Sequence, residues 1–108
     1  MNTAEYSNEA MKTAPQELND REKQLNAVIG LVGESAEILD VYKKILYQGH
    51  PFDKDKVIDE LGDTLWYANL LINALGTTWE EVFDTNIKKL RKRYGETFDA
   101  EKSIHRTE

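Results

Sequence analysis

Two pairs of acidic residues, each spaced three positions apart, have the residue types needed to bind a divalent cation. Glu34 and Glu37 lie in the segment GESAE, and Glu60 and Asp63 lie in ELGD. Residues at i and i+3 share one face of a helix, so each pair would present both carboxylates on the same side. Mg²⁺ prefers carboxylate oxygens together with water and substrate phosphates. The four residues therefore predict a Mg²⁺ site, in which Mn²⁺ is a possible substitute.

The spacing along the chain allows the two pairs to face each other across a helical hairpin. In an antiparallel hairpin, residues equally far from the turn lie side by side. Pairing Glu34 with Asp63, and Glu37 with Glu60, places the centre of the hairpin between residues 48 and 49 in both cases. The sequence Gly-His-Pro at 49–51 is typical of a turn, so the predicted turn and the predicted pairing agree.

Apolar neighbours distinguish these acids from an ordinary solvated face. Acidic residues on helices usually face water, and this alternative applies to either pair taken alone. Glu34, however, lies within one apolar stripe, and a second stripe runs along the same predicted helix, which should therefore be buried around most of its circumference. The first stripe contains Ala27, Leu31, Ile38, Val41 and Ile45, and the second contains Leu25, Ile29, Val32, Ala36 and Leu39. Crowded, partly buried carboxylates raise one another's pKa or require a cation.

Three glycines lie inside the predicted helices that carry the acids. Gly30, Gly33 and Gly62 each cost about 1 kcal/mol of helix stability relative to alanine. Close helix packing and access for a ligand are both consistent with glycine at these positions.

The elements that would position the acids are all helical. Apolar residues recur at three- and four-residue spacing, and alternation typical of strands is absent from the sequence. Asparagine, aspartate or threonine precedes the later helices as an N-cap, and glycine follows them. We predict an all-α fold of four helices built on a long antiparallel hairpin, with helices over residues 2–13, from Asn19 or Asp20 to Tyr47, from Asp53 to Gly76, and from Thr78 to Gly95.

Length and composition narrow the class of protein. The 108 residues fit one domain, predicted over 1–95, followed by a polar, mobile arm over 96–108. A net charge of −6 disfavours nucleic acid as a partner, and the absence of cysteine excludes disulfides and thiolate metal sites. The sequence contains neither a secretion signal nor a membrane span, so we expect a cytoplasmic protein that does not bind membranes.

The two acidic motifs together resemble those of the MazG family of all-α nucleoside triphosphate pyrophosphohydrolases. The family signature is ExxE, a spacer, then ExxD, and here 22 residues separate Glu37 from Glu60. The segments GLVGESAEILDVYKK and ELGDTLWY also resemble the family helices, and the similarity extends over about residues 5–95. It implies that Glu34, Glu37, Glu60 and Asp63 bind Mg²⁺ and that a polarised water cleaves a (d)NTP to (d)NMP and pyrophosphate.

The resemblance also implies residues that contact the substrate. NIKKLRKRY is similar to the last family helix, in which Asn86, Lys89 and Arg93 would face the nucleotide. A solvated basic face is the alternative for these three residues. Lys44 shares a helix face with Glu37 and is a second candidate for binding phosphate.

Two aromatic residues and the catalytic base complete the predicted site. Trp66 and Tyr67 follow Asp63 by three and four residues and would contact the nucleobase, although such residues more often serve in a core or interface. Glu37 is the predicted general base, although no spacing argument separates it from the other three acids.

The family resemblance further implies a homodimer or homotetramer in nucleotide metabolism, removing non-standard or excess nucleotides. One hairpin cannot cover both apolar stripes of its longest helix, which also favours self-association. Two alternatives remain. A di-iron carboxylate bundle would need ExxH pairs, which are absent from this sequence. A non-catalytic nucleotide-binding or adaptor protein would keep the same helices and bind without turnover.

Overall fold

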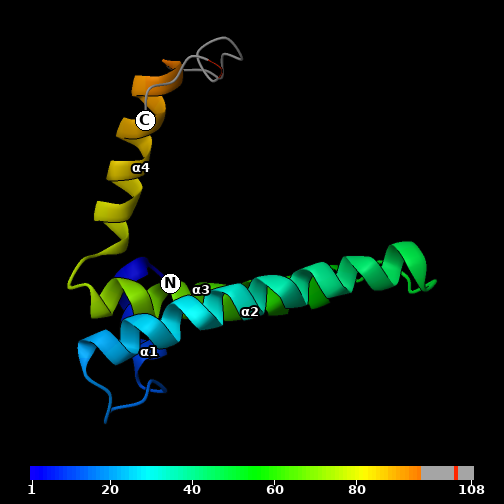
Figure 1. The fold of residues 1–108 in the computed structure, drawn as a ribbon, viewed down its shortest axis with the longest axis horizontal. Helices are drawn as coiled ribbons and strands as arrows, with labels where there is room; N and C mark the ends of the chain where they lie inside the picture. Colours follow the sequence, from blue (N-terminus) through cyan, green and yellow to red (C-terminus); the bar gives the residue numbers. More distant parts are fainter. Residues whose placement is uncertain (96–103, 105–108) are drawn as a thin grey trace. The chain divides into compact units, whose positions relative to one another are not determined.

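The computed structural model describes residues 1–95 and residue 104 (Figure 1). Within residues 1–95 it contains only helices and no strand, which confirms the all-α prediction. The polar arm predicted over 96–108 lies outside the described residues, apart from Ile104. The helices are α1 (Thr3–Met11), α2 (Asp20–Tyr47), α3 (Lys54–Ala74) and α4 (Trp79–Tyr94).

Local capping explains where α2 begins and ends. The Asn19 side chain accepts a hydrogen bond from the Glu22 backbone N–H at 2.9 Å, and the Glu22 carboxylate accepts one from the Asn19 N–H at 3.1 Å. This reciprocal capping box satisfies two backbone donors that the first turn leaves unpaired. After Tyr47, Gly49 adopts a φ of +73°, a conformation that glycine reaches without steric cost. The predicted N-cap and turn of the hairpin are both confirmed.

Similar signals delimit the two later helices. The Asp53 carboxylate accepts hydrogen bonds from the backbone N–H groups of Asp55 and Lys56, at 3.1 and 3.4 Å, and so caps α3. The Thr78 hydroxyl accepts one from the Glu81 N–H at 3.1 Å and caps α4. The third helix ends at Ala74, slightly before the glycine predicted to stop it.

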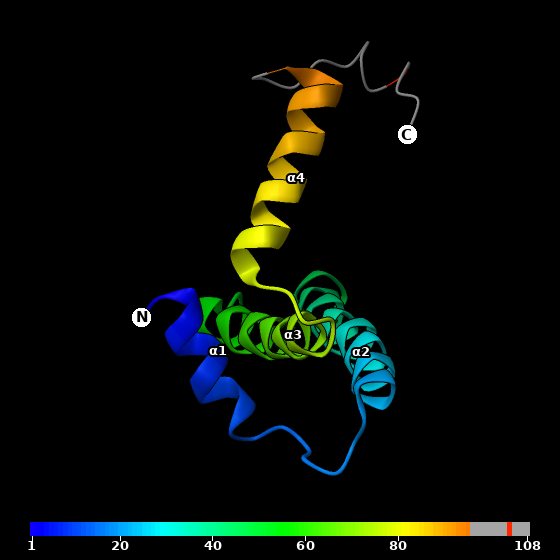
Figure 2. The ribbon, with the colours of Figure 1, turned by 90° about the vertical axis from the view of Figure 1, so that its left-hand side faces the viewer.

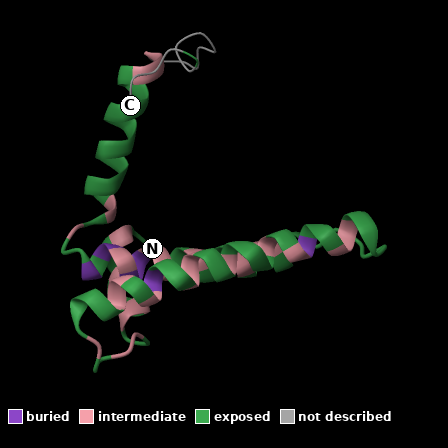
Figure 3. Cartoon of the chain, in the orientation of Figure 1, coloured by how far each residue is buried: buried purple, intermediate pink, exposed green. Residues whose placement is uncertain are grey.

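The antiparallel hairpin of α2 and α3 carries the core. The two helices lie side by side along their length in both views (Figures 1 and 2). Most of the buried residues gather where the start of α2 meets the end of α3, and Val41 is buried further along (Figure 3). The buried apolar residues are Ala27, Val41, Leu70, Ile72 and Ala74.

Only one of the two apolar stripes of α2 is covered within the chain. The stripe that contains Ala27 and Val41 lies against α3 and is buried or half-buried. Residues of the second stripe, such as Leu25 and Leu39, are 62% and 70% exposed. The prediction that α2 is buried around most of its circumference is therefore wrong for the single chain, because α3 covers one face only.

Side-chain hydrogen bonds from α3 hold α1. The Trp66 indole N–H donates to the Ala10 carbonyl oxygen at 3.1 Å and lies 3.2 Å from the Thr13 hydroxyl oxygen. The Asn73 amide donates to the Ser7 hydroxyl oxygen at 2.9 Å. No residue of α1 is fully buried, and these hydrogen bonds connect the helix to α3.

The chain divides into two compact units. The first, Met1–Gly76, contains α1, α2 and α3, and the second begins at Thr77 and contains α4. Along α4, Phe83, Ile87 and Leu90 are exposed and recur at helical spacing, so they form an apolar stripe. Of the helices described, none has the combination of length and apolarity that a bilayer crossing requires.

Candidate functional site

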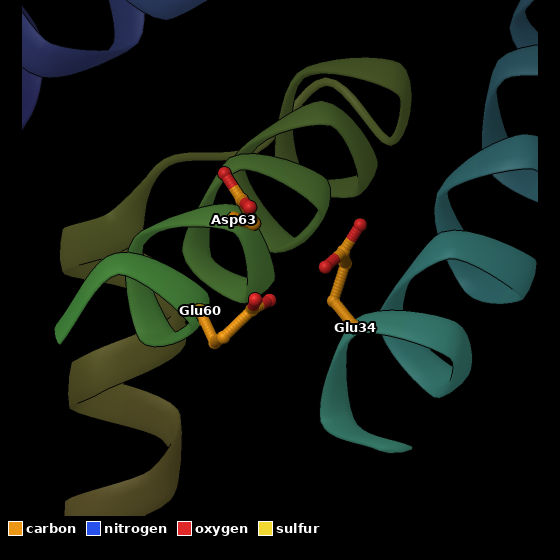
Figure 4. A group of neighbouring side chains, drawn as sticks. All are labelled: Glu34, Glu60 and Asp63. Atoms are coloured by element: carbon orange, nitrogen blue, oxygen red, sulfur yellow. The ribbon is translucent and has the colours of Figure 1, made fainter. Parts of the chain in front are cut away.

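Three of the four predicted carboxylates come together between α2 and α3. Glu34, Glu60 and Asp63 each offer an oxygen, and these three oxygens all lie within 4.8 Å of one another. Figure 4 shows Glu34 extending from α2 toward Glu60 and Asp63 on α3. Glu34 and Glu60 are half-buried, and Asp63 is exposed. We call these three residues the acidic cluster.

The hairpin geometry produces this cluster. Glu60 and Asp63 are one turn apart and share a face of α3. Glu34 lies on the face of α2 that packs against α3, between the half-buried residues Leu31 and Ile38. The turn at residues 48–53 then brings the two faces to the same level, as equal distances from the turn predicted.

Glu37 does not belong to the three-oxygen group. Its side chain is exposed, unlike that of Glu34 on the same helix. It still lies close enough for its charge to raise the pKa of Glu60. The structure thus brings three of the predicted acids together and places the fourth beside them.

Glu60 is the electrostatic centre of the cluster. Partial burial, followed by the negative charges of Glu34 and Glu37, raises the pKa of its carboxyl group above the ordinary value. The charges of Asp63 and Asp59 act in the same direction. Sequence reasoning did not single out Asp59, although it directly precedes the ExxD motif. A cation bound here would offset this accumulated negative charge.

The donor set fits Mg²⁺. Magnesium binds oxygen ligands at about 2.0–2.1 Å, so opposite ligands lie about 4.2 Å apart. Three carboxylate oxygens within 4.8 Å require only small side-chain movements to reach that geometry. The exposed side of Asp63 leaves room for water and phosphate oxygens, which usually complete the coordination of this ion.

A tyrosine from α1 lies near the cluster and was not identified from the sequence. Burial and, to a smaller extent, the negative charge of Asp63 raise the pKa of the half-buried Tyr6 hydroxyl. The spacing of Tyr6 within α1 carried no signal for this position. Its place depends on how Trp66 and Asn73 dock that helix on α3.

The predicted aromatic residues have structural roles. Trp66 holds α1 and contacts Tyr67 edge-on, with ring centroids 5.0 Å apart. The Tyr67 ring lies against Gly30, where a Cβ atom would collide with it. Gly30 therefore serves close packing, whereas Gly33 and Gly62 face open space. Contact of either aromatic side chain with a nucleobase stays a prediction.

The predicted phosphate-binding residues lie on two helices. Lys44 of α2 is half-buried, and its ammonium group lies 3.0 Å from an Asp40 carboxylate oxygen, which lowers the pKa of Asp40. Asn86, Lys89 and Arg93 lie on α4, in the second compact unit. Asn86 and Lys89 are exposed, and Arg93 is half-buried. Their contact with a nucleotide stays a prediction.

A separate cavity of about 230 Å³ lies within the first unit, where the end of α1 and the start of α2 meet the end of α3. None of the predicted site residues lines it. Its lining is Met11, Ala14, Gln16, Asp20, Lys23, Leu70, Asn73 and Ala74.

Comparison with known proteins supports the family resemblance. The gene 37 protein of Mycobacterium phage L5 is 40% identical over 74 residues, an alignment that covers 60% of this chain and 60% of that protein. No solved structure matches the chain significantly. The family model of the MazG nucleotide pyrophosphohydrolase domain matches residues 22–98, which include both acidic motifs, α2 from Glu22 onward, and all of α3 and α4. The chain belongs to the MazG nucleotide pyrophosphohydrolase family.

Proposed function

We propose that this protein is a Mg²⁺-dependent nucleoside triphosphate pyrophosphohydrolase that converts (d)NTP to (d)NMP and pyrophosphate. The acidic cluster carries the proposal, because three carboxylate oxygens within 4.8 Å form a donor set suited to Mg²⁺ in a member of this family. When bound, Mg²⁺ would polarise the attacking water and offset negative charge on the phosphate oxygens.

The residues of the chain have separate tasks in this proposal. Glu34, Glu60 and Asp63 hold the cation and, through it, the triphosphate. A water attacks at the α–β bridge, the bond to the bridging oxygen breaks, and pyrophosphate leaves. Glu37 lies outside the three-oxygen group but beside Glu60, so it is the acid best placed to accept the proton of the water. Lys44 would bind phosphate after exchanging its partner Asp40 for the substrate.

The basic face of α4 would provide further contacts to the nucleotide. Lys89 and Arg93 are cations that can donate hydrogen bonds to phosphate oxygens, and Asn86 lies on the same face. Lys89→Ala and Arg93→Ala should weaken triphosphate binding more than Mg²⁺ binding without nucleotide, measured by calorimetric titration. Equal loss of both affinities would instead indicate that these residues support the fold.

We also propose that the protein acts as a homodimer or homotetramer. The exposed second stripe of α2 supports self-association, because a helix with this much uncovered apolar surface is normally buried.

Product analysis tests the proposed reaction. A panel of ribo- and deoxyribonucleoside triphosphates is incubated with the protein and Mg²⁺, and both products are identified by anion-exchange chromatography. We expect monophosphate and pyrophosphate in equal amounts. Diphosphate and orthophosphate would contradict the proposed site of cleavage. Binding of a triphosphate without any product would favour the non-catalytic adaptor.

A further inference from the structure

The exposed second stripe of α2 extends beyond the five residues that define it in the sequence. Alternating steps of four and three residues connect seven positions over residues 25–46, which we call the outer seam. Its five large apolar side chains are between 62% and 71% exposed. Ala36 and Lys43 occupy the other two positions and are exposed as well. The outer seam consists of Leu25, Ile29, Val32, Ala36, Leu39, Lys43 and Leu46.

This spacing is that of a coiled coil. Steps of four and three residues keep side chains on one line when two helices wrap around each other, so the outer seam matches a second helix with the same repeat. It lies on the side of α2 away from the residues that pack on α3, such as Ala27 and Val41. A second helix can therefore cover it without disturbing the hairpin.

We infer that the outer seam binds the outer seam of a second copy of this chain, with the two α2 helices antiparallel. A contact between identical surfaces needs only one patch per subunit, and two-fold pairs are the commonest arrangement of soluble oligomers. Charge selects the orientation. In a parallel pair, Lys43 would face Lys43 of the other copy within the seam, which costs free energy. In an antiparallel pair, each Lys43 lies opposite Leu25 of the other copy and within one turn of the acidic residue Glu22 of that copy.

The sequence also selects the register. With the two-fold axis beside residue 34, Ile29 faces Leu39 and Val32 faces Ala36, and almost the whole seam is used. The small residues Gly33 and Ser35 then flank the axis and allow the helices to approach closely. Gly33 has open space where its Cβ would be, so packing within the chain does not account for this helix-destabilising residue. Close approach of two α2 helices at this point would explain why glycine occupies position 33.

The arrangement leaves each acidic cluster with its own subunit. Glu34 points toward α3 (Figure 4), on the side of α2 away from the outer seam. The inference rests on the self-association proposed above but not on hydrolysis. Its tests therefore measure cross-linking and mass, so their failure can be distinguished from a failure of the proposed reaction.

Single cysteines test the orientation, because the natural chain contains no cysteine. Ser35→Cys places its thiol beside the two-fold axis, and a short bismaleimide should convert most of the protein to covalent dimer. Lys43→Cys is the matched control. Its two copies would be about 27 Å apart along an antiparallel pair of helices, beyond the reach of the reagent. Equal cross-linking of both variants would overturn the antiparallel orientation, and no cross-linking of Ser35→Cys would overturn the inferred contact.

A charge in the seam tests the surface itself. Ile29→Glu should reduce the native mass of the assembly, because a carboxylate would have to be buried against apolar residues. Ile58→Glu, at a similarly exposed apolar position on α3, should leave the mass unchanged. Ile29 is 63% exposed in the single chain, so circular dichroism should show that both variants stay helical. A wild-type monomer, or an Ile29→Glu variant that keeps the full mass, would overturn the inference. Either result would instead favour another occupant of the outer seam, such as the apolar stripe of α4.

Discussion

The inner and outer faces of α2 carry apolar residues at the same spacing but meet different surroundings. The inner face packs on α3 and contains Glu34, whose carboxylate is half-buried beside Glu60. On the outer face, the outer seam contains one charged residue, Lys43, whose side chain is 54% exposed. Hydrophobic periodicity thus identifies a surface that needs covering. The charged residue on each face then indicates its role: Glu34 belongs to the acidic cluster formed with α3, and Lys43 favours an antiparallel second copy.

The largest expected effect concerns the acids of the inner face. Glu34→Gln, Glu60→Gln and Asp63→Asn should each lower turnover by about 100-fold or more, because each removes a charged oxygen ligand and keeps the side-chain shape. Glu37→Gln should also remove most activity, as expected for a general base. Pyrophosphate release measured at saturating Mg²⁺ provides the comparison.

Asp59→Asn is the matched control for these variants. Asp59 is an exposed acid beside Glu60 but lies outside the three-oxygen group, so its amide should leave turnover close to that of the wild type. If two or more of the four site variants are as active as the wild type, the proposed acidic site is wrong.

Mg²⁺ should stabilise the inner face and have no specific effect on the outer one. Binding to the folded protein alone adds about 2.7 kcal/mol to the free energy of unfolding when free Mg²⁺ exceeds its dissociation constant a hundredfold. Differential scanning calorimetry should show a higher melting temperature for the wild type and for Ile29→Glu. The increase should be absent in Glu60→Gln. A wild type without any shift at millimolar Mg²⁺, with or without a non-hydrolysable triphosphate, would argue against the metal site.

Two glycines one turn apart compare the packing of the two faces. In an Ile29→Glu background, where the outer seam is unpaired, Gly30→Ala should destabilise the fold by about 1–3 kcal/mol because its Cβ collides with Tyr67. Gly33→Ala should stabilise the same background by up to about 1 kcal/mol, because it favours the helix and meets nothing. Urea unfolding measures both values, and changes of the same sign would refute the distinction.

The smallest expected effect is a pH dependence at Glu60. Because its pKa is raised in the folded state, the folded protein binds this proton more tightly than the unfolded chain does. Ionisation of Glu60 therefore lowers stability as pH rises from the ordinary glutamate pKa through the raised value. Without Mg²⁺, Glu60→Gln should be more stable than the wild type at neutral pH, and this advantage should shrink in acid. Thermal unfolding at a series of pH values would test this, and a constant difference would contradict it.

Local signals in the sequence predicted most of the fold. Asn19, Asp53 and Thr78 cap helices as expected, because a capping interaction involves only residues within one turn. The facing of Glu34 and Asp63 followed equally from a short turn and regular helices. These features depend on residues that are neighbours in the sequence or on equal numbers of residues on either side of a turn, so they could be predicted from the sequence.

Features that depend on how side chains from distant segments fit together could not be predicted from the sequence. The sequence left open whether Gly30 served packing or a ligand, and the structure assigns it to the Tyr67 ring. Trp66 was a candidate for base contact, yet its indole reaches α1 across 56 positions of the chain. Whether Glu37 joins the other acids depends on the rotation of α2 by a fraction of a turn, which periodicity alone does not determine.

The attachment of α1 also determines the order in which the first unit opens. The hairpin joins residues through one short turn, whereas the bonds of Trp66 and Asn73 to α1 close loops of more than 50 residues. Loop closure of this length costs conformational entropy, and α1 contributes no fully buried side chain to offset it. Transient detachment of α1 should therefore need less free energy than unfolding of α2 and α3. In native-state hydrogen exchange, the amides of Tyr6 to Met11 would exchange well before those of the hairpin core around Leu70.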